Sequence, residues 1–224
     1  MLTSFIAVDT ETTGLDFERD RMIEIAAVRF EDGKPVAEFE ALLSPGDRAL
    51  SPVSRLITGL DPGRLREAPP AAETLRAFAA FAGNLPLVAH NAEFDAHFVR
   101  RAQEAEGLAP LPGSWLDSLL MSRIAWPDWD SHKLDTLARR LDLARDGEHR
   151  ALPDARRAGL VFLEALRITQ ANTSGDAWRD LSRLATDLPD WSLVFNERGA
   201  SSPAPGLSGV GSSATEIAAG AASP

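Results

Sequence analysis

Four carboxylates and one histidine occur in three short segments of this sequence, at spacings that could build one site. They are Asp9 and Glu11, then Asp95, and finally His149 with Asp154. Core packing does not call for acids at the ends of apolar strands, whereas clusters of carboxylate oxygens are preferred ligands of Mg²⁺ and Mn²⁺ rather than of zinc. The sequence therefore predicts a site for divalent cations.

The first two acids, Asp9 and Glu11, lie at the end of a short apolar segment. In an extended strand this spacing points both side chains to the same face, where each charge raises the pKa of the other unless a cation intervenes. The segment continues into Thr12, Thr13 and Gly14, and the glycine lets the backbone approach a substrate closely. An Asp-x-Glu pair alone is common, so its meaning depends on the other two segments.

Asp95 and Asp154 are each expected at the start of a helix. Asn91 can cap the helix that carries Asp95, and Pro153 is typical of the first turn in which we expect Asp154. His149 then belongs to the loop before this second helix, from which it can hang over a site. A structural reading also exists, because acids are favoured in the first turn of any helix and a loop histidine needs no function.

The elements that must position these residues follow from hydrophobic periodicity and turn signals. Strands are expected over residues 4–10, 21–30, 35–43, 85–89 and 115–116, and helices over 71–83, 92–107, 118–124 and 154–169. A further helix carries Leu137, Leu141 and Leu143, with Ser131 or Asp135 as its cap, and a proline-rich connection covers residues 44–70. Asp32 and Gly33 make a hairpin turn between the second and third strands. This order predicts an α/β fold whose mixed central sheet begins with an antiparallel meander, continues with alternating helix and strand, and is flanked by helices.

Composition limits the classes of site. The 224 residues include no cysteine, which excludes disulfides, thiolate zinc sites and cysteine nucleophiles. No apolar run is long enough to span a bilayer and no leader segment is evident, so we expect a cytoplasmic protein without a membrane partner. A formal net charge of −10 is unusual for a nucleic-acid-binding protein. Cations bound to the four acids would reduce that objection, and arginine pairs such as Arg100-Arg101 form either local basic patches or solvated helix faces.

Together, the three segments resemble the motifs of a known family. Residues 8–15 (VDTETTGL), 88–95 (VAHNAEFD) and 149–155 (HRALPDA) are similar to the three motifs of the DEDDh exonucleases, the DnaQ-like, RNase-T-like superfamily. Residues 131–138 and 57–60 also resemble this family, and the similarity spans residues 4–170. Relatives include proofreading subunits such as DNA polymerase III epsilon and the exonuclease domains of DinG-type helicases. A sister branch has tyrosine at the position of His149, and this chain contains no tyrosine.

The resemblance implies an RNase H-like fold and a site that holds two divalent metal ions, Mg²⁺ or Mn²⁺. Asp9, Glu11 and Asp154 would hold the first ion, Asp9 and Asp95 the second, and His149 would be the general base, for which the ordinary imidazole pKa of about 6.5 is suitable. The substrate-binding residues implied or considered with it are Thr12, Thr13, Leu15, His90, Asn91 and Phe94. For His90 and Phe94, a place in the core is the alternative.

The implied activity is 3′–5′ exonucleolytic hydrolysis of DNA to nucleoside monophosphates, in replication proofreading or repair, with a single-stranded 3′ end as the expected partner. Trimming of RNA is the alternative, and an inactive adaptor is a third reading, which the presence of all five site residues disfavours. Two tryptophans, Trp126 and Trp129, are either base-stacking platforms or core residues.

We expect three regions, an exonuclease domain at 1–170 as the resemblance implies, a tryptophan-containing appendage at 171–198 and a flexible low-complexity tail at 199–224. The appendage either packs back on the core, hiding Trp178 and Trp191, or docks a polymerase, helicase or clamp.

Overall fold

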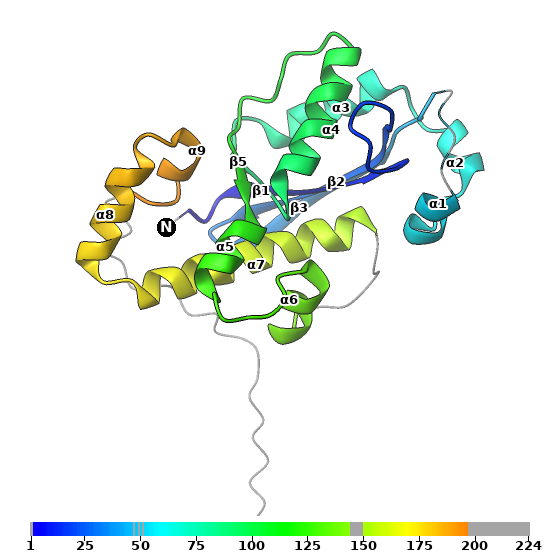
Figure 1. The fold of residues 1–224 in the computed structure, drawn as a ribbon. Coiled ribbons are helices and arrows are strands. Elements are labelled where there is room, and N and C mark those ends of the chain that lie inside the picture. The colour runs from blue at the N-terminus through cyan, green and yellow to red at the C-terminus, as the bar shows by residue number, and fades with distance from the viewer. Residues whose placement is uncertain (1, 47, 49, 51, 144–149, 197–224) are drawn as a thin grey trace, which may run out of the picture.

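The fold is a mixed five-stranded sheet covered by helices on both faces (Figure 1). The computed structural model describes residues 2–46, 48, 50, 52–143 and 150–196. His149 and the tail at 199–224 lie outside these ranges. Within the described ranges, no helix is both long enough and apolar enough to cross a lipid bilayer.

The sheet begins as the predicted antiparallel meander and then turns parallel. β1 (Phe5–Thr12), β2 (Met22–Glu31) and β3 (Lys34–Leu42) pair antiparallel, whereas β4 (Leu87–Ala89) and β5 (Trp115–Asp117) run parallel to β1. The strand order is β3-β2-β1-β4-β5, which places β1 at the centre. Asp32 and Gly33 both adopt positive φ in the hairpin turn, as the Asp-Gly pair predicted.

The helices agree with the periodicity of the sequence over most of the chain. They are α1 (Pro52–Thr58), α2 (Pro62–Arg66), α3 (Ala71–Ala82), α4 (Ala92–Ala105), α5 (Ser118–Ala125), α6 (Leu134–Arg140), α7 (Ala151–Asn172), α8 (Gly175–Ala185) and α9 (Pro189–Ser192).

Three details of the helix prediction were wrong. The connection at 44–70 contains α1 and α2, each of which begins at a proline. The N-cap of α6 is Lys133 rather than Ser131 or Asp135. The last core helix also begins three residues earlier than expected, so Asp154 is its fourth residue.

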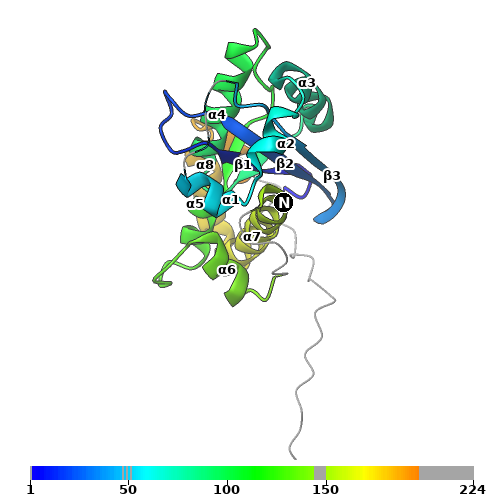
Figure 2. The same cartoon turned by 90° about the vertical axis from the view of Figure 1, so that its right-hand side faces the viewer.

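Alternation along β1 directs its side chains to two separate cores. Phe5 and Ala7 pack with residues of α5 and α7, whereas Ile6 and Val8 pack with residues of α3 and α4. Figures 1 and 2 show these two groups of helices on opposite sides of the sheet. By the same alternation, Asp9 and Glu11 continue the face that α7 covers, and Thr10 continues the face of α4.

The segment after α7 packs against the main core. Trp178 of α8 is 2% exposed and joins Val194 and Phe195 in the cluster that contains Phe5. Its indole Nε1 donates to the carbonyl oxygen of Asn196 at 2.8 Å. Trp191 is partly buried against the same cluster, so α8 and α9 cover the end of the sheet as the first alternative for this segment anticipated.

Gly159 allows α7 to lie close to the sheet. A Cβ at this position would lie 2.4 Å from a ring carbon of Phe30 and 2.9 Å from the Cβ of Ala7. A side chain here would therefore push α7, and Asp154 with it, away from β1.

We predict that Gly159→Ala lowers the free energy of unfolding by about 1–3 kcal/mol, because the overpacking outweighs the helix propensity gained. Denaturant titration measures this change. Gly175→Ala is the control, since a Cβ at Gly175 would meet nothing within 4 Å among the described residues, and it should be neutral or stabilising. Equal stability of the two variants would contradict the role of Gly159.

Candidate active site

The first two acids lie on the last residues of the central strand. Asp9 and Glu11 belong to β1, and their registered partners on β2 are Ala26 and Glu24. A register irregularity follows at Glu11 and Thr12, where the pairing with β2 ends. The two carboxylates thus lie on the α7 side of the sheet, next to the carboxyl end of the parallel strand β4.

The third acid, Asp95, is supplied by the first turn of α4, directly after β4. Asn91 adopts a left-handed conformation (φ 74°, ψ 56°) that turns the chain from the strand into the helix. Asn91 occupies the N-cap position as predicted, but within the described part of the chain its side chain makes no capping hydrogen bond. Asp95 is 3% exposed and accepts a hydrogen bond from Thr10 Oγ1 at 2.8 Å. This bond joins α4 to β1 beside Asp9.

The fourth acid, Asp154, lies in the first turn of α7. Arg157, which is 3% exposed, donates from Nη1 to Asp154 Oδ1 at 2.6 Å. The same nitrogen lies 3.9 Å from Asp135 Oδ1 of α6. A buried guanidinium therefore holds the carboxylate of Asp154 in place.

The four carboxylates influence one another, which identifies them as one cluster. The pKa of Asp9 is raised well above its ordinary value, first by burial and then by the charges of Asp95, Asp154 and Glu11. Burial raises the pKa of Glu11 to about 8, with the charge of Glu24 as the next cause. Burial also raises the pKa of Asp95 to about 7. A buried group of acids in which each disfavours the ionisation of the next is stabilised by a cation.

The donor set fits hard divalent cations, since it is made of carboxylate oxygens. Among the residues that the structure describes, however, no three histidine or acidic side chains converge as a ready-made metal site. Thr10 holds Asp95 and Arg157 holds Asp154. Ligation by three or more of these acids therefore requires some of their side chains to rearrange.

Sequence reasoning missed three charged residues that surround the cluster. Glu24 is fully buried on β2, Arg150 forms an ion pair with it, and Arg157 binds Asp154. One signal was available for Glu24, because an acid between Ile23 and Ile25 in an apolar strand is unusual. Arg150 carried no signal of this kind, because its partners Glu24 and Glu40 are distant in sequence. Arg157 lies three residues after Asp154, and this spacing on one helix face was the signal available for it.

His90 is placed as a satisfied structural histidine. Its Nδ1 lies 2.9 Å from Ser118 Oγ and its Nε2 lies 2.8 Å from the carbonyl oxygen of His132. Burial lowers its pKa. With both ring nitrogens engaged, His90 ties the end of β4 to α5 and to the loop before α6, which agrees with the core alternative.

Phe94 also has a packing role. Its ring centroid is 4.9 Å from that of Phe98 and 5.8 Å from that of Phe17. Asn91 is exposed, and its backbone N–H donates to Asp117 Oδ1 at 3.1 Å. The Asn91 side chain is thus the more accessible of these two candidate contacts.

The segment after β1 is held by its own polar side chains. Thr12 Oγ1 donates to the carbonyl oxygen of Gly14 at 2.6 Å, and Thr13 Oγ1 donates to Asp20 Oδ1 at 2.8 Å. A Cβ on Gly14 would lie 2.3 Å from an Asp20 carboxylate oxygen, so a larger residue there would have to displace the Asp20 side chain that binds Thr13. Leu15, in contrast, is 81% exposed and is free to meet a ligand.

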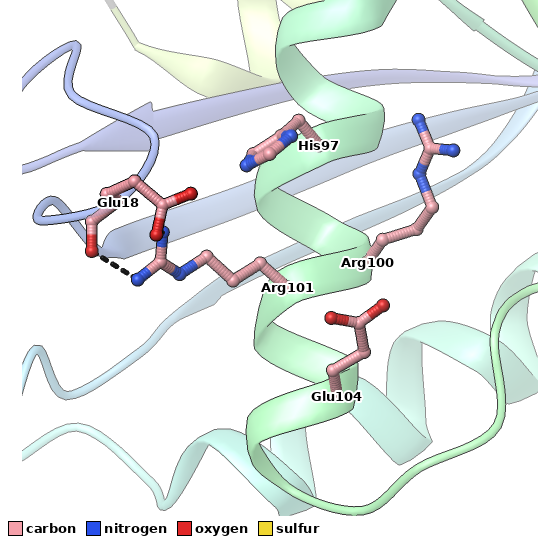
Figure 3. A pocket seen from close by; sticks show the side chains of 5 residues that line it. All are labelled: Glu18, His97, Arg100, Arg101 and Glu104. Atoms are coloured by element: carbon pink, nitrogen blue, oxygen red, sulfur yellow. Dashed lines mark hydrogen bonds and ion pairs between the residues drawn. The ribbon is translucent and has the colours of Figure 1, made fainter.

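A pocket of about 380 Å³ lies on the outer side of α4, lined by Glu18, His97, Arg100, Arg101 and Glu104 (Figure 3). Arg101 donates to the carbonyl oxygens of Phe17 and Glu18 and lies 3.4 Å from the Glu18 carboxylate. The Phe17 ring lies 4.2 Å from that of His97. The pocket contains none of the predicted site residues, and its contacts fasten the Leu15 segment to α4.

Neither tryptophan of the loop before α6 offers an open stacking face. Trp126 and Trp129 stack on each other with ring centroids 4.7 Å apart, and the Arg140 guanidinium lies over Trp129 at 4.8 Å. Trp126 also packs against the core. A base could stack on Trp129 only after displacing one of these groups, so the structure favours the structural alternative.

Comparisons with known proteins show the family of this chain. A family model described as exonuclease, of the RNase T type, matches residues 6–162. DNA polymerase III of the PolC type from Caldanaerobacter subterraneus is 37% identical over 166 residues, covering 74% of this chain and 12% of that protein. The Bacillus cereus protein of the same name is 32% identical over 164 residues, covering 73% and 11%. The chain thus spans about a tenth of the length of these relatives.

Solved structures show the same fold. Exonuclease X in complex with 5′ overhanging duplex DNA is 26% identical with a TM-score of 0.61, and the match covers 72% of this chain and 90% of that one. Exonuclease I without ligand is 19% identical with a TM-score of 0.65, covering 83% and 47%, a likeness in fold alone. Because the family model matches residues 6–162, which is more than half of the chain, this chain belongs to the RNase T exonuclease family, within the DnaQ-like DEDDh superfamily.

Proposed function

We propose that this nuclease is a 3′–5′ exonuclease that hydrolyses DNA from its 3′ end and releases nucleoside monophosphates, in replication proofreading or repair. The observation that carries the proposal is the acidic cluster, in which Asp95, Asp154 and Glu11 all raise the pKa of Asp9. DNA is favoured over RNA because the relatives are named as DNA polymerases and exonuclease X was solved with duplex DNA. The same names favour a polymerase as the protein partner.

We assign the metal site to Asp9, Glu11, Asp95 and Asp154. Two ions, Mg²⁺ or Mn²⁺, would supply an activated water and would stabilise charge on the phosphate oxygens of the cleaved bond. In the metal-free protein Thr10 binds Asp95 and Arg157 binds Asp154, and these contacts would adjust when the two carboxylates ligate an ion.

Proton transfer is assigned to His149 on the strength of the sequence motif. The residue precedes α7, whose first turn carries Asp154. At its ordinary pKa of about 6.5 an imidazole is largely neutral above pH 7 and can accept the proton of the attacking water.

The segment after β1 is assigned to the terminal nucleotide. Leu15 projects into solvent from a backbone that Thr13, Asp20 and Arg101 hold in place. We propose that the Leu15 side chain wedges against the terminal base and that the backbone near Thr12 and Thr13 holds the 3′-hydroxyl. Asn91 is the additional accessible polar contact.

The decisive test is degradation of 5′-labelled DNA and RNA oligonucleotides, single- and double-stranded, with Mg²⁺ or Mn²⁺. We expect stepwise shortening of DNA from the 3′ end, and a decrease of about 10³-fold or more in Asp9→Asn, which loses several kcal/mol of transition-state stabilisation. Asp176→Asn, which changes an exposed acid of α8, should keep the wild-type rate. Faster degradation of RNA would reassign the substrate, and no metal-dependent hydrolysis would refute the proposal.

His149→Ala should slow hydrolysis by about 10²–10⁴-fold while Mn²⁺ affinity, measured by calorimetry, stays unchanged. The wild-type rate should increase between pH 6 and 7 as the imidazole loses its proton, and the variant should lose that increase. An unchanged rate and pH profile in the variant would remove His149 from this role.

The raised pKa values make the stability of the metal-free protein depend on pH. Glu11 and Asp95 have folded-state pKa values of about 8 and 7, above those of an unfolded chain. Their stabilising contribution is complete below about pH 4 and is lost as pH rises through those folded values.

Metal ions should reverse this trend, because ligation requires the ionised carboxylates. In EDTA, the free energy of unfolding should decrease between pH 6 and pH 8.5, by about 1.4 kcal/mol per pH unit for each proton released. Addition of Mn²⁺ should raise the melting temperature more at pH 8.5 than at pH 6. A larger effect at pH 6 would contradict the assignment of these acids.

A further inference from the structure

A fifth acid, Glu24, lies beside the carboxylate cluster and has no part in the proposed reaction. It belongs to β2, is 0% exposed, and pairs in register with Glu11 on β1. Directly opposed residues of an antiparallel pair share one face, with Cβ atoms about 5 Å apart. Glu24 thus brings another buried negative charge against the site, which requires either a cation or a protein partner.

That partner is Arg150, which is the N-cap residue of α7. Its Nη2 donates to Glu24 Oε1 and to Glu40 Oε1, each at 2.8 Å. The backbone N–H of Ala151 donates to the second oxygen of Glu24 at 3.4 Å. Both oxygens of Glu24 are therefore engaged by the start of α7, so Glu24 serves this helix rather than a metal ion.

We infer that Glu24 and Arg150 form a clamp that positions the functional groups of α7 against β1. The inference rests on the proposed exonuclease function. Asp154 follows Arg150 by about one helical turn, and its backbone N–H donates to the Arg150 carbonyl oxygen at 3.3 Å. His149 is covalently joined to the same residue. Fixing Arg150 on β2 and β3 therefore fixes the start of the helix that carries Asp154.

The same helix provides a matched control. Arg156 forms an ion pair with Glu38 of β3, and its side chain is 39% exposed. The side chain of Arg150 is similarly exposed, at 38%, but Glu24 at its other end is fully buried. The two arginines thus tie α7 to the same edge of the sheet, while Arg150 binds the acid that lies beside the site.

The test compares kcat and KM of Arg150→Met, Arg150→Lys and Arg156→Met on a DNA oligonucleotide that the wild type degrades. Arg150→Met should lower kcat by about 10–100-fold, as expected for a small misplacement of reacting groups, with KM within about threefold of wild type. Arg150→Lys should recover most of the loss because one donor can still reach Glu24. Arg156→Met should keep the wild-type kcat.

Two readouts are independent of turnover: hydrogen exchange of the first-turn amides of α7, and Mn²⁺ affinity by calorimetry. Exchange should accelerate and affinity decrease in Arg150→Met but not in Arg156→Met.

Because an unpaired Glu24 could prevent folding, the double variant Glu24→Gln/Arg150→Met removes the buried charge and should show the same loss of kcat. If the double variant matches Arg156→Met in kcat and exchange, the clamp is refuted. If the wild type degrades no substrate, the proposed function fails, and exchange alone still decides whether the clamp exists.

Discussion

The structure depends on holding four like charges together at the end of its central strand. Burial raises the pKa values of Asp9, Glu11 and Asp95, and the charges of neighbouring acids raise those of Asp9 and Glu11 further. The protein offsets part of this cost with individual donors, Thr10 for Asp95 and Arg157 for Asp154. The remaining repulsion among the buried carboxylates favours the binding of cations, so the cluster that destabilises the metal-free fold is also suited to bind metal ions.

Two helices on opposite faces of the sheet complete the cluster. Asp95 and Asp154 each lie in a first turn, where the helix dipole favours negative charge. One helix approaches through the short connection from β4, and the other packs closely because Gly159 carries no side chain. The acids are therefore close enough to raise the pKa of Asp9, although they come from three elements that are far apart in sequence.

Much of this arrangement was predictable from local patterns. The strands that alternate or are wholly apolar, the Asp-Gly hairpin and the amphipathic helices were all recognised, because each depends on residues close in sequence. Strand order was not, since it depends on pairing between distant segments such as residues 6 and 87. The helices α1 and α2 were not predicted, because the prolines of this segment indicated a loop, whereas a proline begins each helix. The four acids were found by motif, whereas Glu24 and Arg150 gain their roles only from each other across distant segments. Arg157 binds Asp154 three residues before it, but its burial depends on the fold.

The register between β1 and β2 determines on which face of the sheet the acids of the site lie. Side chains on β1 alternate between the two cores, with Asp9 and Glu11 on one side and Thr10 on the other. A shift of one residue would exchange the two sets, sending both acids toward α4 and the threonine toward α7. An insertion or deletion of one residue inside β1 would therefore misplace the acids even where the hydrophobic residues could repack. Differences in chain length among relatives should lie in the connections between elements.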